Sequence, residues 1–439
     1  MLRRTTGFFV YLFDRYLPDP LVIVVFITLL VFAAGIFGQG QSPLDMLTYW
    51  QEGFWSLLSF GMQMALILAL GFTVASTPLF ARLVKAMASY ADSPGKAILL
   101  VSVVSLATSW LNWGVGLVIG AILGRELARR VEGVDYRLLI ASAYSGFLLW
   151  HGGFSGSIPL LIANPGHFLE DQIGLIGTDR TIFSPLNLGI VIVLLIAVPI
   201  TNWWMMRGIA NPVTIRSDLI ADEPQEKAAL APRRPAERLE SSRAIAWIVA
   251  AMGGVAVVLY WSRSLGSLNL DLVNFILIFL GIGLHGTLRR FLDTFGEGTR
   301  GAAAVLIQFP FYAGIMGMMS GSGLTVTVSN VFVDIASADT LPVLSFLAAG
   351  LVNVFIPSGG GQWAVQGPIM MEAAQALQAD QARVALAVAW GDAWTNMIQP
   401  FWALPALAIA GLKASDIMGF CVMVLFVSGA VIGLGFWLF

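Results

Sequence analysis

Hydrophobic residues run along this chain in long, nearly uninterrupted stretches. The stretches at 21–37 and 417–439 contain no charged residue, and the stretch at 186–198 has the same character. A helix needs about 20 mainly apolar residues to cross a bilayer. The pattern therefore predicts an all-α polytopic membrane protein. The predicted apolar segments are 20–38, 54–75, 97–124, 138–163, 186–206, 244–262, 271–288, 301–320, 341–377, 384–411 and 416–438.

Two of these segments are broken in the middle. Polar sequence containing several glycines interrupts both 97–124 and 341–377. Each segment could cross the membrane once, or it could enter the membrane as a re-entrant hairpin and turn back. The hydrophobic pattern alone allows both arrangements.

Positive charges decide between the two arrangements, because cytoplasmic loops are enriched in Lys and Arg. With two hairpins and a cytoplasmic N-terminus, 21 of the 24 lysines and arginines lie on the cytoplasmic side. Two simple crossings would instead leave 9 inside and 15 outside. We therefore expect a multi-pass protein of the cytoplasmic (inner) membrane with two hairpins and a periplasmic or extracellular C-terminus.

The two halves of the chain echo each other at a nearly constant offset. Both contain two spans, a hairpin broken by glycines, a span interrupted by proline and a closing span. The matching positions are 245 or 246 residues apart, namely Gln63 and Gln308, Gly114 and Gly359, Gly116 and Gly361, and Pro159 and Pro405. This order predicts an internal repeat.

The repeat divides the chain into four parts. We predict an N-terminal transmembrane repeat at 1–206, a cytoplasmic linker at 207–243, a connecting helix at 244–262 and a C-terminal repeat at 263–439. The portion of the linker at 218–240 is rich in Pro, Ala, Glu and Arg, which is typical of a flexible connector. Five crossings precede the second repeat, so the two repeats have inverted topology, as in many secondary transporters.

Composition narrows the classes of protein further. Hydrophobic residues make up 57% of the 439 residues and charged residues only 11%, against about 25% charged in soluble domains. The net charge of -2 argues against a nucleic-acid partner. The single cysteine, Cys421, excludes an intrachain disulfide and a thiolate metal cluster, and we expect it to pack inside its span.

Glycine-rich sequence predicts where a small anion binds. Non-helical backbone at membrane depth is tolerated only inside protein or along a wet cavity, and half-helix N-termini there attract anions. In the second hairpin the glycines let backbone amides converge, and Ser358 and Gln362 add side-chain donors; a flexible extracellular loop is the alternative. The predicted substrate-binding residues in the two hairpins are Asn112, Gly114, Gly116, Ser358, Gly359, Gly360, Gly361 and Gln362.

His151, Ser155 and Ser157 occupy the break in the proline-interrupted span of the first repeat. A histidine at this position could relay a proton or hydrogen-bond a substrate. It could equally be a packed histidine with satisfied hydrogen bonds. We include these three residues in the predicted substrate site.

Asp392 is an acid deep in a predicted span. A charge at the bilayer centre costs at least about 2.5–3.5 kcal/mol, so such residues usually carry function. Thr395, Asn396 and Gln399 follow Asp392 at helical spacing and predict one polar helix face. This face is either a coupling site for a cation or proton, or an interhelical hydrogen-bond network.

Tryptophans gather near these breaks, and interface anchoring is their commoner role. Some of them could instead wall an apolar pocket. They are Trp110, Trp113, Trp363, Trp390, Trp394 and Trp402.

With these motifs in view, the chain resembles the bacterial short-chain fatty acid transporter family. The resemblance spans nearly the whole chain and is carried by 16–20, 148–157, 355–368 and 391–402. The family is similar to the ion-transporter superfamily, whose divalent-carboxylate members have inverted repeats, two re-entrant hairpins and an elevator mechanism.

The resemblance implies secondary active uptake of butyrate- or acetoacetate-like anions, without an organic cofactor and with a homodimer as the expected assembly. Sodium-coupled dicarboxylate relatives carry Ser-Asn-Thr triplets at their hairpin tips, and this sequence has no such triplet at either tip. Coupling to sodium and coupling to protons therefore both stay open, with sodium the one metal ion considered.

Other classes of protein are weaker alternatives. A transporter of other small carboxylates or a passive anion channel would share most of these features. An intramembrane serine protease would use the short Gly-x-Ser-Gly pattern at 153–156, but a hydroxyl nucleophile needs a base within hydrogen-bond reach. No nucleotide-binding Gly-x-x-x-x-Gly-Lys-Ser/Thr pattern occurs in the chain, so a primary pump would require another subunit. The sequence shows no soluble catalytic domain, and we expect a transporter and not an enzyme.

Overall fold

The computed structural model describes residues 20–215, 234–263, 268–354 and 356–439. Within these ranges the chain forms helices joined by short connections and no strand, so the predicted all-α fold is confirmed. The first half contains α2 (Pro20–Gln39), α3 (Pro43–Gly53), α4 (Leu58–Ala75), α5 (Pro78–Ala88), α6 (Pro94–Leu111), α7 (Trp113–Arg130), α8 (Tyr136–Ser145), the 3-10 helix η1 (Gly146–Gly152), α9 (Ser157–Leu161), α10 (Glu170–Ile173) and α11 (Pro185–Arg207).

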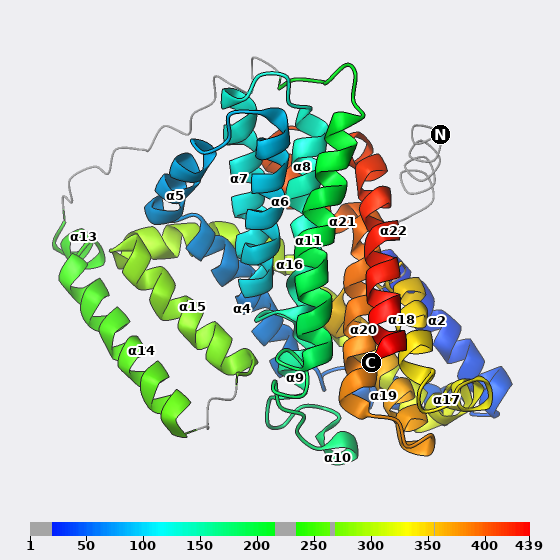
Figure 1. Ribbon diagram of the computed structural model, residues 1–439. Helices are drawn as coiled ribbons and strands as arrows, with labels where there is room; N and C mark the ends of the chain where they lie inside the picture. The colour runs from blue at the N-terminus through cyan, green and yellow to red at the C-terminus, as the bar shows by residue number, and fades with distance from the viewer. Residues whose placement is uncertain (1–19, 216–233, 264–267, 355) are drawn as a thin grey trace.

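The second half repeats much of this order (Figure 1). It contains α13 (Pro235–Glu240), α14 (Arg243–Arg263), α15 (Leu270–His285), α16 (Leu288–Ser322), α17 (Leu324–Ile335), α18 (Leu341–Asn353), α19 (Gly359–Ala376), α20 (Gln381–Thr395), the 3-10 helix η2 (Asn396–Ile398), α21 (Pro400–Ala410) and α22 (Ala414–Leu438).

Six helices in the described part of the chain are long and apolar enough to cross a membrane: α2, α4, α6, α11, α14 and α22. Three shorter apolar helices, α15, α17 and α18, accompany them. Large apolar side chains are exposed along these helices, as Phe26, Ile196 and Trp247 show. Such outward-facing surface suits a lipid environment, in which apolar side chains do not have to be hidden from water.

Both broken segments fold as pairs of helices. The segment 97–124 forms α6 and α7, which pack against each other and are joined at Asn112 alone. They approach closely because Gly116 has no side chain: a Cβ there would lie 2.6 Å from the Cα of Ser109. In the second half, residues 354–358 join α18 to α19 in the same order.

The proline-interrupted spans are broken helices. The first is divided into α8, η1 and α9, and the second into α20, η2 and α21. In Figure 1, α8 lies above α9, whereas α20 lies below α21. This arrangement is the one that an inverted repeat requires, and the inverted repeat itself stays a prediction.

Some elements differ from the prediction. The expected span at 301–320 is the second part of α16, a helix of 35 residues that begins at Leu288 and continues past Pro310. Charged residues between 289 and 300 hid its first turns from a hydropathy pattern. Likewise α5 was not predicted, because Arg82 and Lys85 interrupt its apolar sequence.

The first residues of the predicted linker at 207–243 are tied to the helical body. The Asp135 carboxylate caps α8 and also accepts the Val213 N–H at 2.9 Å, while the Tyr136 N–H donates to the Val213 carbonyl at 2.8 Å. The other end of the linker contains α13. Residues 216–233, on which the prediction of flexibility rests, lie outside the described residues.

The helices pack as two groups. One group consists of α2–α5 and α14–α17, in which α16 lies against α4. The other consists of α6–α9, α11 and α18–α22, in which α18 lies against α20 and α11 against α22. The main contacts between the groups run through α7 and α19, the second helices of the two hairpins.

Close packing of the first hairpin gives a stability prediction. Gly116→Ala should destabilise the protein by about 1–3 kcal/mol, because the added methyl group overpacks the contact with α6. Thermal unfolding of the purified protein in detergent would measure the effect. Gly189→Ala in α11 is the matched control, since a Cβ there meets nothing within 4 Å. Equal unfolding temperatures of the two variants would contradict the packing.

Candidate functional site

The break in the first repeat follows from close backbone contacts. A Cβ at Gly146 would lie 2.5 Å from the Ser105 Cβ, so α8 meets α6 where the 3-10 turn begins. The chain leaves that turn past α6, where the Phe154 N–H donates to the Trp110 carbonyl at 2.8 Å. The freed polar groups of the break thus find partners inside the protein, as non-helical backbone at membrane depth requires.

The break in the second repeat follows from proline. Pro400 begins α21 and Gln399 before it is extended, with φ -91° and ψ 110°. A residue before proline avoids the helical region, so the helix cannot continue through this point. The Tyr144 hydroxyl of the first repeat donates to the carbonyls of Asn396 at 2.6 Å and Gln399 at 3.2 Å, which the break has released from the helix.

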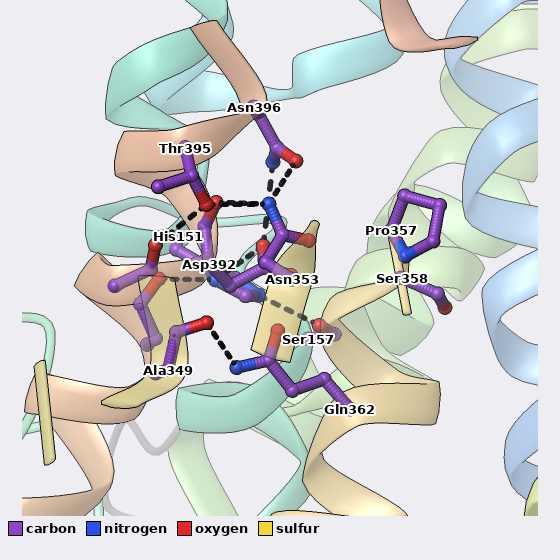
Figure 2. A network of polar contacts seen from close by, with 12 residues as sticks. His151, Ser157, Ala349, Asn353, Pro357, Ser358, Gln362, Asp392, Thr395 and Asn396 are labelled. Atoms are coloured by element: carbon purple, nitrogen blue, oxygen red, sulfur yellow. Dashed lines mark hydrogen bonds and ion pairs between the residues drawn. The ribbon is translucent and has the colours of Figure 1, made fainter. Parts of the chain in front are cut away.

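Asn353, at the end of α18, is the centre of a buried polar network (Figure 2). Its Nδ2 lies 2.9 Å from the Asp392 carbonyl, 2.9 Å from the Thr395 Oγ1 and 2.8 Å from the Asn396 Oδ1. In return the Gln399 Nε2 donates to the Asn353 carbonyl at 3.0 Å. The first arm of the second hairpin is thereby fixed to the second broken helix.

This network corrects the predicted polar helix face. The α-helix ends at Thr395, Asn396 lies in η2, and Gln399 is extended. The four predicted ion-coupling residues are brought together, yet by a turn around Asn353 and not by helical spacing. Proline in the sequence predicted an interruption of this span, but the spacing of the four residues did not show that the turn begins before Asn396.

Asp392 and His151 join the two repeats. The His151 Nδ1 lies 3.4 Å from the Asp392 Oδ2 and 2.7 Å from the Ala389 carbonyl, and its Nε2 lies 2.8 Å from the Ser157 Oγ. All three side chains are fully buried. The ring of His151 also stacks on Trp150, with centroids 3.6 Å apart.

The tip of the second hairpin lies against this pair. Ser358 caps α19, and its Oγ accepts the Gly361 N–H at 3.3 Å. A Cβ at Gly359 would come within 2.7 Å of the Ser157 Oγ and still closer to the His151 ring, so glycine is required there. Gly360 and Gly361 in turn lie against aromatic residues of α4 and α16.

Gln362 is used differently from the prediction. Its Nε2 donates to the Ala349 carbonyl at 3.0 Å (Figure 2). The same Nε2 donates to the Gln366 Oε1 at 2.9 Å. Both partners belong to the second hairpin. The amide group therefore holds the two arms of the hairpin together, and its Nε2 is occupied.

The tip of the first hairpin lies beside the first break. Asn112 caps α7 by accepting the Val115 N–H at 3.0 Å, and Gly114 in the first turn lies close to Gly71 of α4. The Ser155 Oγ accepts the Trp113 N–H at 2.9 Å. Ser155 is the serine of the Gly-x-Ser-Gly pattern, so this serine caps a hairpin, whereas His151 contacts Ser157.

An aromatic cluster closes the region between the tips. The ring centroid of Trp113 lies 5.3 Å from that of Trp402 and 6.1 Å from that of Trp150. Phe147 stacks on Trp150 with ring centroids 5.4 Å apart. Trp402 also donates to the Pro357 carbonyl at 3.0 Å. Trp113, Trp363 and Trp390 are buried, so these tryptophans line the interior and do not anchor the membrane interface.

Sequence reasoning missed Asn187, a buried asparagine of α11. Its Nδ2 donates to the Gly152 carbonyl at 2.9 Å, and its Oδ1 accepts the Trp390 Nε1–H at 2.9 Å. Asn187 therefore supports both broken helices. An asparagine at the start of the apolar stretch 186–198 was the signal that could have identified it.

Several buried polar atoms of the site have no hydrogen-bond partner among the described residues. On the side of the first repeat they include the donors Asn112 Nδ2, Trp113 Nε1 and Trp150 Nε1, and the Ser109 hydroxyl. On the side of the second repeat they include the acceptors Asn353 Oδ1, Asp392 Oδ1, Gln399 Oε1 and Gln362 Oε1, and the donor Trp363 Nε1. Unpaired donors favour an anion and unpaired acceptors favour a cation or a proton. In native proteins such groups call for an explanation.

Membrane-length helices, two hairpins and two broken helices around a buried polar centre define a polytopic membrane transporter. The chain belongs to the short-chain fatty acid transporter family, whose model matches residues 1–439. A protein of Escherichia coli K12 named "Putative short-chain fatty acid transporter" is 42% identical over 440 residues, covering 100% of both chains. A Haemophilus influenzae protein of the same name is 40% identical over 443 residues, covering 99% of both chains.

Among solved structures, the chain is similar to the YdaH transporter of Alcanivorax borkumensis, whose crystal structure is described as having an unusual topology. The TM-score is 0.61 at 15% sequence identity, over 96% of this chain and 97% of that one. This likeness shows the fold. The family and the two curated relatives make the protein a membrane transporter and not an enzyme.

The polar network gives a stability prediction. Asn353→Ala removes one donor group from three buried acceptors, and an unsatisfied buried group costs about 1–3 kcal/mol. The variant should therefore unfold at a lower temperature than wild type in detergent. Ser428→Ala is the control, because the Ser428 hydroxyl bonds only within its own helix. An Asn353→Ala protein as stable as the control would show that the network does not hold the hairpin.

Proposed function

We propose that this protein takes up short-chain fatty acids, monocarboxylates such as butyrate and acetoacetate, across the cytoplasmic membrane by cation-coupled secondary transport. The observation that carries the proposal is the presence of both unpaired donors and unpaired acceptors among the buried polar atoms. Donors such as Trp113 Nε1 belong to the first repeat, and acceptors such as Asp392 Oδ1 belong to the second. A transported anion and its coupling cation need these two kinds of surface.

The anion side combines helix N-termini with an apolar wall. The first turns of α7 and α19 are glycine-rich, and both begin at a buried break. A helix N-terminus carries roughly half a positive charge and free N–H groups, which favour a carboxylate. The Trp113–Phe147–Trp150–Trp402 cluster supplies apolar surface for a short hydrocarbon tail.

Support for this substrate class comes also from the relatives. The family description and both curated relatives name short-chain fatty acids. A single carboxylate needs one anion site, and the aromatic cluster leaves the rest of the surroundings apolar. Other small carboxylates fit the same description less closely when they carry a second charge.

The cation side is the network around Asp392 and Asn353. Its unpaired acceptors would accept a sodium ion or a proton, and the buried Asp392 carboxyl is the one acid among them. The predicted coupling residues Asp392, Thr395, Asn396 and Gln399 all contribute to this network. Asp392 contacts His151, and the His151 ring lies against Gly359, so ion binding would influence the substrate site.

The packing of the helices is compatible with an elevator mechanism. The group with the hairpins and broken helices holds the whole site, and it meets the other group mainly through α7 and α19. Glycines at this boundary, such as Gly71 and Gly360, have no side chain and lie close to the side chains of the neighbouring helices. In such a mechanism the group with the hairpins and broken helices would slide past the other group. The inverted repeats and a cytoplasmic N-terminus would allow the site to open to either side of the membrane.

Uptake by purified protein tests the function. In proteoliposomes loaded with unlabelled butyrate, external labelled butyrate should enter by counterflow well above the level in protein-free vesicles. Counterflow requires a carrier that binds one substrate at a time, so a channel would not produce it. Absence of counterflow with folded protein, for acetoacetate as well, would contradict the proposed substrate class.

Cysteine labelling tests the position of the second hairpin. In a Cys421→Ala background, Ser358→Cys should react with a membrane-impermeant maleimide from the outside, and butyrate should slow the reaction. Ser337→Cys, in the exposed connection between α17 and α18, is the control that should react equally with and without butyrate. Labelling of Ser358→Cys only from the cytoplasm would contradict the proposed topology.

A further inference from the structure

The contact between Asp392 and His151 deepens the proposed function, on which this inference rests. We propose that the coupling ion is a single proton, which this pair carries together with the substrate anion. The pair joins the two broken helices, and Ser157 connects it to the tip of the second hairpin. The protein would then be a proton–monocarboxylate symporter.

Geometry fixes the neutral tautomer of His151. Its Nδ1 lies 2.7 Å from the Ala389 carbonyl, and a carbonyl can only accept a hydrogen bond. The proton of a neutral ring must therefore be on Nδ1. The Nε2 then accepts the hydroxyl proton of Ser157 over 2.8 Å. The Nδ1–H also faces the Asp392 Oδ2 at 3.4 Å, where a carboxylate would attract it.

The Asp392 carboxyl has few partners for a negative charge. Its Oδ2 receives the Asn396 Nδ2–H at 3.3 Å, at the long end of hydrogen bonding, and its Oδ1 has no partner among the described residues. Buried carboxylates that stay charged normally have several donors or a cation. Asp392 has one amide and one imidazole.

No other charged group of the neighbouring elements pairs with Asp392. The elements packed against α20 are α18, α19, α9, α22, η1 and η2. Of these, α18, α9 and η2 contain no ionisable side chain, and His151 is the one on η1. The remaining groups are engaged elsewhere: Glu372 with Gln172, Asp416 with the Lys413 N–H and Arg383 of α20 with the Phe436 carbonyl, while Cys421 is buried in α22. The Tyr144 hydroxyl of α8, which reaches the end of α20, donates to the Asn396 carbonyl.

The net charge of the His151–Asp392 pair therefore changes by one unit with each proton that it binds. With neutral His151 and ionised Asp392 the pair carries one negative charge, and one added proton on either residue makes it neutral. A second proton would leave a buried positive charge. Burial favours the neutral pair when a substrate anion is bound beside it, so one proton should accompany the substrate-loaded transition. The pair releases this proton together with the substrate and is ionised when the empty protein returns. The substrate-free ionised pair carries one negative charge, and the neutral pair with a bound carboxylate anion carries the same charge. Transport of one proton with one anion is therefore electroneutral.

The position of the pair links the proton to the substrate. A Cβ at Gly359 would lie 2.7 Å from the Ser157 Oγ, so the hairpin tip touches the side chain that bonds His151. When the imidazole gains a proton, its Nε2 becomes a donor and the Ser157 hydroxyl must turn. That rotation takes place against the glycine-rich N-terminus of α19, where the substrate carboxylate is proposed to bind.

Transport driven by a pH gradient tests the proposal. In sodium-free proteoliposomes, an acidic exterior should drive accumulation of labelled acetoacetate above that in protein-free vesicles, and an inward sodium gradient at equal pH should not. Asp392→Asn, which mimics the neutral carboxyl, should lose accumulation completely while keeping counterflow that no longer depends on pH. Glu372→Gln is the control carboxyl variant and should accumulate substrate like wild type.

The outcomes separate the two proposals. Accumulation that requires sodium, or accumulation that survives in Asp392→Asn, would overturn proton coupling and leave the transporter intact. Loss of counterflow in the wild-type protein would instead contradict the proposed function. A second measurement needs no transport: infrared difference spectra between acidic and alkaline pH should show the carbonyl band of a buried protonated carboxyl. This band should be absent in Asp392→Asn and present in Glu372→Gln; its persistence in Asp392→Asn would overturn the proposal.

Discussion

Buried backbone that leaves the helical conformation must find hydrogen-bond partners inside the protein, and the centre of this transporter is built around that requirement. Each broken helix exposes N–H and C=O groups where lipid or water cannot satisfy them. Side chains of neighbouring helices take their place: Tyr144 of the first repeat binds the carbonyls of the second break, while Asn187 of α11 and Trp110 of the first hairpin bind Gly152 of the first. The breaks, the hairpins and the buried polar residues thus form one interdependent unit.

The same unit explains why the candidate site has two chemical sides. Most polar atoms of the network satisfy backbone or one another, and the atoms left over include donors near α7 and acceptors near Asn353. The proposed binding of an anion together with a cation rests on this remainder. The Asp392–His151 contact lies where the two sides meet, so binding at one side has a direct physical route to the other.

Much of the fold could be predicted from the sequence, because the length of a hydrophobic stretch and the positive charges beside it are visible in neighbouring residues. The two broken segments, 97–124 and 341–377, and the two proline-interrupted spans, 138–163 and 384–411, all contain helix ends in their interiors. Elements with mixed character were missed: the N-terminal part of α16 and the whole of α5 carry charges that hide them from a hydropathy pattern.

The site was predictable in its members and less so in its contacts. Asp392, His151 and Ser157 were singled out as polar residues in apolar spans, yet nothing in their spacing showed that a pair of residues 241 positions apart would touch. That contact depends on how two helices cross in space. Gln362 was expected to face a substrate, and its amide nitrogen instead bonds within the hairpin, a choice that depends on the distance to Ala349.

The location of a bound substrate tests this account most directly. A high-resolution structure of the protein with butyrate should show the carboxylate at the N-termini of α7 and α19, beside His151 and Gly359, with the hydrocarbon tail against Trp113 and Trp402. Butyrate density in a different part of the protein, with the region between the hairpin tips closed and packed, would contradict the assignment of the buried polar centre as the transport site.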